Sequence, residues 1–168
     1  IMGLWMVQSV KKEIAEDLSF GTICEMASKC TIPSIVDAND DRFLAPENMT
    51  AEVQKACEES GQQIPQGIAE VAAVIYNSLA VCYAKTLKEL EEQTGCSYRT
   101  IHVVGGANAD YLNRLTAEKT GRTVLAGPTE ATAIGNLAVQ MIIGKECNDL
   151  KDARNCIFHS FEIKQYEP

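Results

Sequence analysis

Two glycine-containing turns are the places in this sequence where a small ligand could approach the backbone closely. Gly105 and Gly106 follow a short β-branched run and precede a helical pattern, with Ala107 next. Glycine has no Cβ, so a phosphate can come close, and the free N–H groups at the start of a helix favour an anion. An ordinary tight turn accounts for these glycines equally well. A dinucleotide fingerprint would need a third, spaced glycine, and a P-loop would need Lys-Ser/Thr; both are absent.

The second turn, within residues 126–133, surrounds one carboxylate with small residues. Gly127 and Pro128 end a second β-rich run, and Glu130 stands at the start of the helical pattern that follows. From spacing alone, the simpler interpretation is an acidic residue that complements the helix dipole, while alanine and glycine allow close packing. The alternative is a turn that faces a ligand.

The remaining reactive side chains match no catalytic or metal-binding pattern. An EF-hand that began at Asp37 would need glycine and glutamate at its sixth and twelfth positions, which hold Arg42 and Asn48. The two histidines are His102, inside a predicted strand, and His159, which has no acid or nucleophile near it in the sequence. We therefore expect neither a catalytic residue nor a metal site in this chain.

Composition indicates one domain, residues 1–168, with an ordinary globular make-up. Apolar residues form 46% of the chain and charged residues 23%. The net charge of −8 argues against nucleic acid or an anionic membrane as a partner, since both require a basic face. No apolar run approaches the ~20 residues that cross a bilayer. The seven cysteines include no CxxC pair and their number is odd, so we expect a reducing, cytoplasmic setting without structural zinc.

The elements that would position the two turns alternate as in an α/β layer. We expect strands at 100–104 and 123–125 and helices at 109–119 and 130–143. Ligands in open α/β sheets bind at the carboxyl ends of strands, so the two turns would lie together.

Helices dominate the sequence before residue 100. Helical periodicity covers about 2–17, 22–29 and 66–93, and turn-forming residues fill 31–50. We expect Thr50 to cap a further short helix. The middle of the long helix is apolar nearly all round, which predicts a buried central position.

Taken together, these motifs resemble the C-terminal domain of the FGGY family of carbohydrate kinases. The resemblance is carried by residues 101–106, 112–117 and 126–136. Residues 1–8 and 40–49 resemble most the members that phosphorylate L-rhamnulose, and residues 40–49 are less typical of glycerol or xylulose kinases. The similarity covers nearly the whole chain, although it thins near the end.

The resemblance implies an α/β fold, the C-terminal part of an actin-like (ribonuclease H-like) ATPase domain, helix-rich with few strands. In the family this domain binds ATP across a cleft from an N-terminal domain. Ala107 departs from the three glycines that many members have, and it narrows the approach to a phosphate. The residue matching the disulfide partner of Cys57 in some relatives lies near Val74, where no cysteine occurs, so no disulfide is expected. The residues that the resemblance assigns to the nucleotide are Gln8, Gly105, Gly106, Ala107, Gly127, Pro128, Glu130 and Asn136.

The implied reaction is transfer of the γ-phosphoryl group of ATP to a ketose hydroxyl, with Mg²⁺ on the phosphates. The expected substrate is L-rhamnulose, giving L-rhamnulose 1-phosphate; L-fuculose, L-ribulose and xylulose stay as alternatives. The catalytic Asp and most sugar contacts of the family would lie upstream of Ile1, so this chain alone is expected to be inactive. A non-catalytic actin-like module that binds nucleotide is a further possibility.

Overall fold

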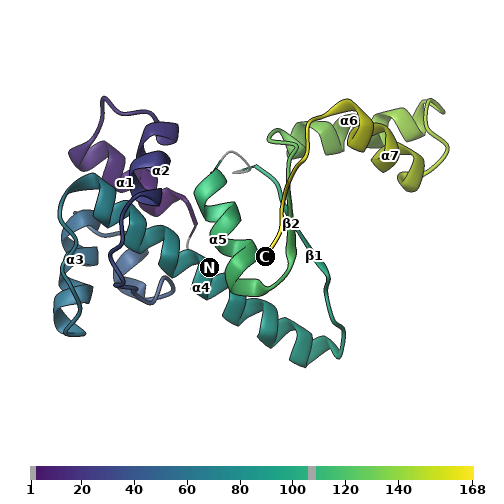
Figure 1. Ribbon diagram of the computed structural model, residues 1–168. Helices are drawn as coiled ribbons and strands as arrows, with labels where there is room; N and C mark the ends of the chain where they lie inside the picture. The colour runs from purple at the N-terminus through teal and green to yellow at the C-terminus, as the bar shows by residue number, and fades with distance from the viewer. Residues whose placement is uncertain (1–2, 106–108) are drawn as a thin grey trace.

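The molecule consists of a helical body, a small sheet and a projecting helical hairpin (Figure 1). The computed structural model describes residues 3–105 and 109–168. The helical body contains α1 (Trp5–Ile14), α2 (Phe20–Ser28), the 3₁₀ turn η1 (Asp41–Phe43), α3 (Met49–Glu59) and α4 (Gly67–Thr94). The remaining elements are β1 (Thr100–Val103), α5 (Asp110–Thr120), β2 (Thr123–Ala126), α6 (Ala131–Ile143), α7 (Leu150–Ser160) and β3 (Lys164–Tyr166).

The long helix α4 is the centre of the helical body. Residues 71–76 and 78–80 are almost fully buried, and α1, α2, α3 and α5 all contact this helix. Its sequence is apolar nearly all round at these positions, so it can be covered from every side. Gly95 ends the helix in the left-handed conformation, with φ 66°. The expectation of a buried central helix is confirmed.

By length and composition α4 could also span a membrane, contrary to the expectation that no apolar run comes near that length. More than half of its most apolar window is buried inside the protein. Core helices of globular proteins pass the same test, so the finding is weak evidence for a membrane span.

The start of α3 corrects the expected cap. The helix begins at Met49, and the side chain of Asn48 caps it by accepting the Ala51 N–H at 2.7 Å. Thr50 lies inside the first turn, where its N–H and hydroxyl both donate to Glu13 Oε2, at 2.9 and 2.6 Å. The Met49 N–H donates to the other oxygen of Glu13, at 2.7 Å. A carboxylate from α1 thus neutralises the positive end of α3 and joins the two helices.

We predict that Glu13→Ala destabilises the protein by about 1–2 kcal/mol, the usual cost of losing a helix cap. The variant leaves two backbone N–H groups and the Thr50 hydroxyl without their acceptor. Urea denaturation followed by circular dichroism measures the change. Glu16→Ala, an exposed acidic position just beyond α1, serves as the control and should change stability by less than about 0.5 kcal/mol.

The sheet brings the two expected turns to one edge. β1 and β2 run parallel, with Val103 opposite Ala126, so the segments that follow them leave from the same side. β3 pairs with β2 in the antiparallel direction, which gives the strand order β1-β2-β3. This arrangement confirms a helix-rich α/β fold. Neither α7 nor β3 is among the elements expected from sequence.

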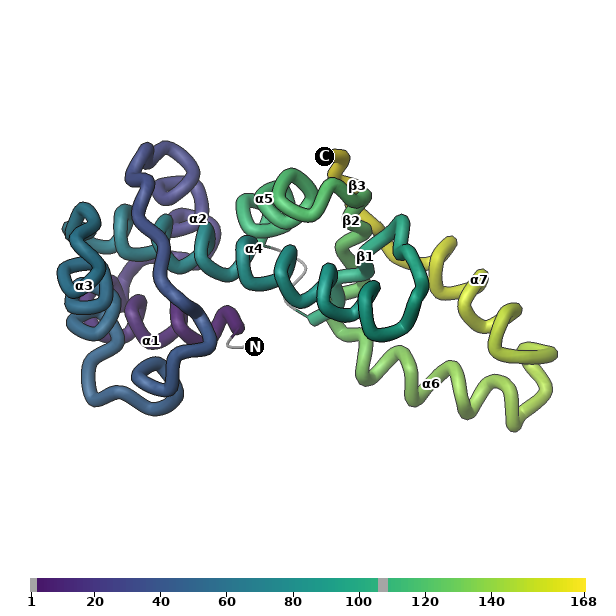
Figure 2. The backbone as a smooth tube through the Cα atoms, turned by 90° about the horizontal axis from the view of Figure 1, so that it is seen from below, coloured from purple at the N-terminus to yellow at the C-terminus, as the bar shows by residue number. Residues whose placement is uncertain are grey.

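Helices α6 and α7 form an antiparallel pair, here called the α6–α7 hairpin, that extends away from the helical body (Figure 2). Its small core is separate from the main one and contains Ala138, Cys147 and Ala153. Other apolar side chains of the hairpin are more than half exposed, namely Leu137, Val139, Ile143, Leu150 and Phe158. The hairpin therefore depends on its own contacts and on the strands that lead into it.

Candidate functional site

A cavity of about 380 Å³, here called the first cavity, lies where the helical body meets the turn after β1. Gln8 of α1 and Gly105 line it, and Ala109 at the start of α5 completes that side. Gly105 has φ 75°, a conformation that glycine adopts readily. The structure therefore places two of the residues expected to bind a nucleotide around one space. Gly106 and Ala107 lie outside the described residues.

The exposed side chain of Gln8 also borders a second cavity of about 410 Å³. The aromatic residues Trp5 and Tyr83 line this space, together with Val104 beside the first turn. An amide that borders two cavities can donate and accept hydrogen bonds in either. Gln8 is thus the best placed polar side chain of α1 for contact with a ligand.

The far wall of the first cavity is apolar and uncharged. Cys24 and Phe20 of α2 and Tyr76 of α4 line this part of the cavity. Burial raises the pKa of the Cys24 thiol and of the Tyr76 hydroxyl, so both groups stay protonated at neutral pH. The Tyr76 ring also packs edge-on against Tyr111 of α5, with centroids 5.8 Å apart. Such a wall suits a flat, uncharged group better than a charged one.

The start of α5 supplies the polar side of the site. Ala109 precedes the helix, and no side chain among the described residues caps its first amides. Uncapped N–H groups at a helix start carry partial positive charge and bind anions. A third cavity, of about 400 Å³, lies between α2 and α5 and is lined by Cys24, Asp110 and Arg114. The site thus places the start of a helix, with Asp110 in its first turn, beside an apolar pocket.

The second turn lies at the same sheet edge and is joined to the end of β1. The Gly127 N–H donates to the Val103 carbonyl at 2.9 Å, and the Gly127–Pro128 peptide bond is cis. Glu130 is exposed, and its side chain makes no capping hydrogen bond to α6. Any interaction of Glu130 with the helix dipole is therefore made without a hydrogen bond. Asn136, further along α6, is also exposed. None of the cavities described above includes these residues.

Sequence reasoning missed several residues that shape the site. Cys24 is one of seven cysteines in a sequence without a metal-binding pattern, and nothing in its spacing indicates that it lines both the first and the third cavity. Tyr76 was one of many apolar positions in a long helix, and nothing in its spacing marks it as a cavity wall. Asp110 gives only the weak signal of an acidic residue at a helix start, although both β3 and the third cavity contact it.

Comparison with known proteins places the chain in a family. The model of the FGGY family of carbohydrate kinases, C-terminal domain, matches residues 1–143. The chain is 46% identical over 167 residues to the rhamnulokinase of Oceanobacillus iheyensis, covering 99% of this chain and 36% of that protein. It is 45% identical over 170 residues to the rhamnulokinase of Bacillus subtilis, covering 100% and 35%. The rhamnulokinase of Klebsiella pneumoniae is 37% identical over 169 residues. The chain thus spans about a third of the length of these curated relatives.

Proposed function

Because this chain belongs to the FGGY family of carbohydrate kinases, as its C-terminal domain, we propose that it supplies the nucleotide-binding side of an ATP-dependent ketose kinase. The observation that carries the proposal is the position of Gln8 and Gly105 on one cavity at the carboxyl ends of parallel strands. The names of the relatives favour L-rhamnulose as the ketose and L-rhamnulose 1-phosphate as the product.

In this proposal the residues of the chain bind and orient ATP. The apolar wall around Tyr76 contacts the uncharged part of the nucleotide, and the Gln8 side chain donates a hydrogen bond to the nucleotide. The turn at Gly105 and the first amides of α5 face the phosphates. Gly106 and Ala107 continue this turn in sequence, and the Gly127–Glu130 turn borders the nucleoside side of the same edge. Asn136 is a candidate for an outer contact.

Mg²⁺ would neutralise charge on the ATP phosphates. No three His, Cys, Asp or Glu side chains gather into a possible metal site within residues 3–105 and 109–168. In the proposal, the phosphates of ATP themselves hold this ion. The proton acceptor for the ketose hydroxyl belongs, in the proposal, to the part of the kinase outside this chain. The role of this domain is to hold the γ-phosphoryl group in place, which supplies much of the catalysis in phosphoryl transfer.

A coupled ADP-release assay on the full-length protein that contains this chain tests the proposal. ATP and Mg²⁺ are supplied with L-rhamnulose, L-fuculose, L-ribulose or xylulose. Turnover with L-rhamnulose alone is the expected result. Turnover with another ketose would keep the kinase and change its substrate. ATP binding without turnover on any sugar would favour a non-catalytic nucleotide-binding module.

We predict that Gln8→Ala raises the KM for ATP roughly tenfold, since one hydrogen bond to a bound ligand contributes about 1.4 kcal/mol. The KM for the ketose and kcat should change little, because Gln8 contacts only the nucleotide in this proposal. Lys12→Ala, an exposed position on the same helix, is the matched control. An unchanged KM for ATP in the Gln8 variant would remove Gln8 from the site.

A further inference from the structure

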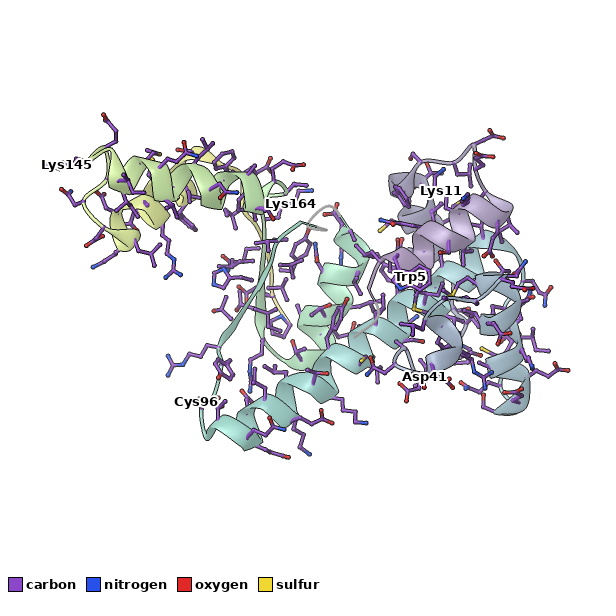
Figure 3. The ribbon with its side chains drawn as sticks, turned by 180° about the vertical axis from the view of Figure 1, so that it is seen from behind. Trp5, Lys11, Asp41, Cys96, Lys145 and Lys164 are labelled. Atoms are coloured by element: carbon purple, nitrogen blue, oxygen red, sulfur yellow. The ribbon has the colours of Figure 1, made fainter. Side chains whose placement is uncertain are left out.

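The strand β3 and the residues just before it contact the start of α5 and the second turn, although they are distant from both in sequence. β3 pairs with β2 and is an outer strand of the sheet. Its first residue, Lys164, lies near the base of the α6–α7 hairpin, whereas Lys145 lies at the hairpin's outer end (Figure 3). The family model matches residues 1–143, so β3 lies beyond the matched segment.

Two side chains on one face of β3 hold the first residue of α5. Lys164 Nζ donates to Asp110 Oδ1 at 3.1 Å, and the Tyr166 hydroxyl donates to the same oxygen. The hydrogen bond from Tyr166 is the main cause that lowers the pKa of Asp110, and the Lys164 ammonium group lowers it further. The carboxylate therefore stays charged at neutral pH. Ala109, the residue before Asp110, lines the first cavity. A shift of Asp110 would therefore move one wall of that cavity.

The segment just before β3 lies directly against the second turn. A Cβ added to Gly127 would come within 2.8 Å of the Glu162 backbone oxygen and 3.6 Å of Ile163 Cα. Only a residue without a side chain allows the two backbones to come this close. Gly127 also donates to Val103, so the residues before β3, Gly127 and the end of β1 are in direct succession of contact.

We infer that β3 is a positioning element of the nucleotide site, which holds the start of α5 through Asp110 and the second turn through Gly127. This inference rests on the proposed function. Lys164 and Tyr166 act through α5 and are positioning residues rather than ligands of ATP. A site whose walls are fixed in advance loses less conformational freedom when ATP binds. Loss of the ties to Asp110 should therefore weaken ATP binding and leave ketose binding and the chemical step unchanged.

The test compares the full-length kinase with its Tyr166→Phe, Lys164→Met and doubly substituted variants. The KM for ATP is expected to rise about fivefold in the double variant and by less in each single variant, while kcat and the KM for the ketose stay within about twofold. Hydrogen exchange should become faster at the first turn of α5 in the same variants, which reports the loosened wall without relying on activity.

Gln165→Ala provides the matched control. Gln165 lies between the two tying residues, and successive side chains of a strand point to opposite faces. Its substitution should leave both the KM for ATP and the exchange of α5 unchanged. A double variant with the wild-type KM for ATP would overturn the inference, and so would an equal rise of both substrate KM values. If the unaltered kinase binds no ATP, the proposed function itself fails, and this inference fails with it.

Discussion

Replacing Gly127 with alanine is expected to destabilise the protein by about 2–4 kcal/mol, because the variant combines a strained backbone with a steric overlap. Gly127 has φ 129°, which L side chains rarely adopt, and its Cβ would lie 2.8 Å from the Glu162 oxygen. A backbone oxygen cannot rotate aside as a side chain does, so residues 162–163 must shift. Chemical denaturation measures the loss of stability. In the full-length kinase the KM for ATP should rise as well, because the same shift displaces the second turn.

Gly135→Ala is the control for this variant. Gly135 lies inside α6, and a Cβ there would meet nothing within 4 Å. Alanine favours a helix over glycine by about 1 kcal/mol, so the free energy of unfolding should stay constant or rise. Similar destabilisation in both variants would show that the packing of Glu162 against Gly127 is not the cause.

The second large effect is expected from Phe43→Ala, which should lower the free energy of unfolding by about 3–5 kcal/mol. Phe43 is the last residue of η1. It is fully buried and is the largest of the fully buried side chains in the described part of the chain. Removing its ring leaves a cavity in the main core, where η1 contacts α3, that the surrounding backbone cannot fully close. Leu44→Ala is the neighbouring control. Leu44 is 65% exposed, so its truncation should change stability by less than about 0.5 kcal/mol.

Local signals in the sequence were sufficient for most element boundaries. Gly95 and Gly121 both end helices in the left-handed conformation, as glycine after a helical pattern predicts. The prediction that Thr50 caps α3 was wrong because Asn48 and Thr50, two positions apart, are both good capping residues. The choice between them depends on Glu13, a residue of another helix, and no local pattern contains that contact.

Long-range contacts explain what could not be predicted at the site. The parallel pairing of two short strands was sufficient to bring Gly105 and Gly127 to one edge. The cavity beside Gln8 needs α1, α2 and α4 packed together, which periodicity alone does not specify. β3 has three residues and no strong pattern, so its pairing with β2 and its ties to Asp110 emerge only in three dimensions. Glu130 and Asn136 remain predictions from the family.

The pairing of β2 with β3 makes the residues between them a single closed loop. Ala126 and Lys164 are direct partners across the ladder, so the chain leaves the sheet and returns to it at almost the same point. In topological terms β2 and β3 form a β-hairpin, and residues 127–163 are a long insertion in its turn. The entropic cost of closing such a loop grows slowly, by about 0.6 kcal/mol for each doubling of its length. The outer end of the α6–α7 hairpin, away from Gly127 and Glu162, can therefore lengthen or shorten while the strand register beside the nucleotide site stays fixed.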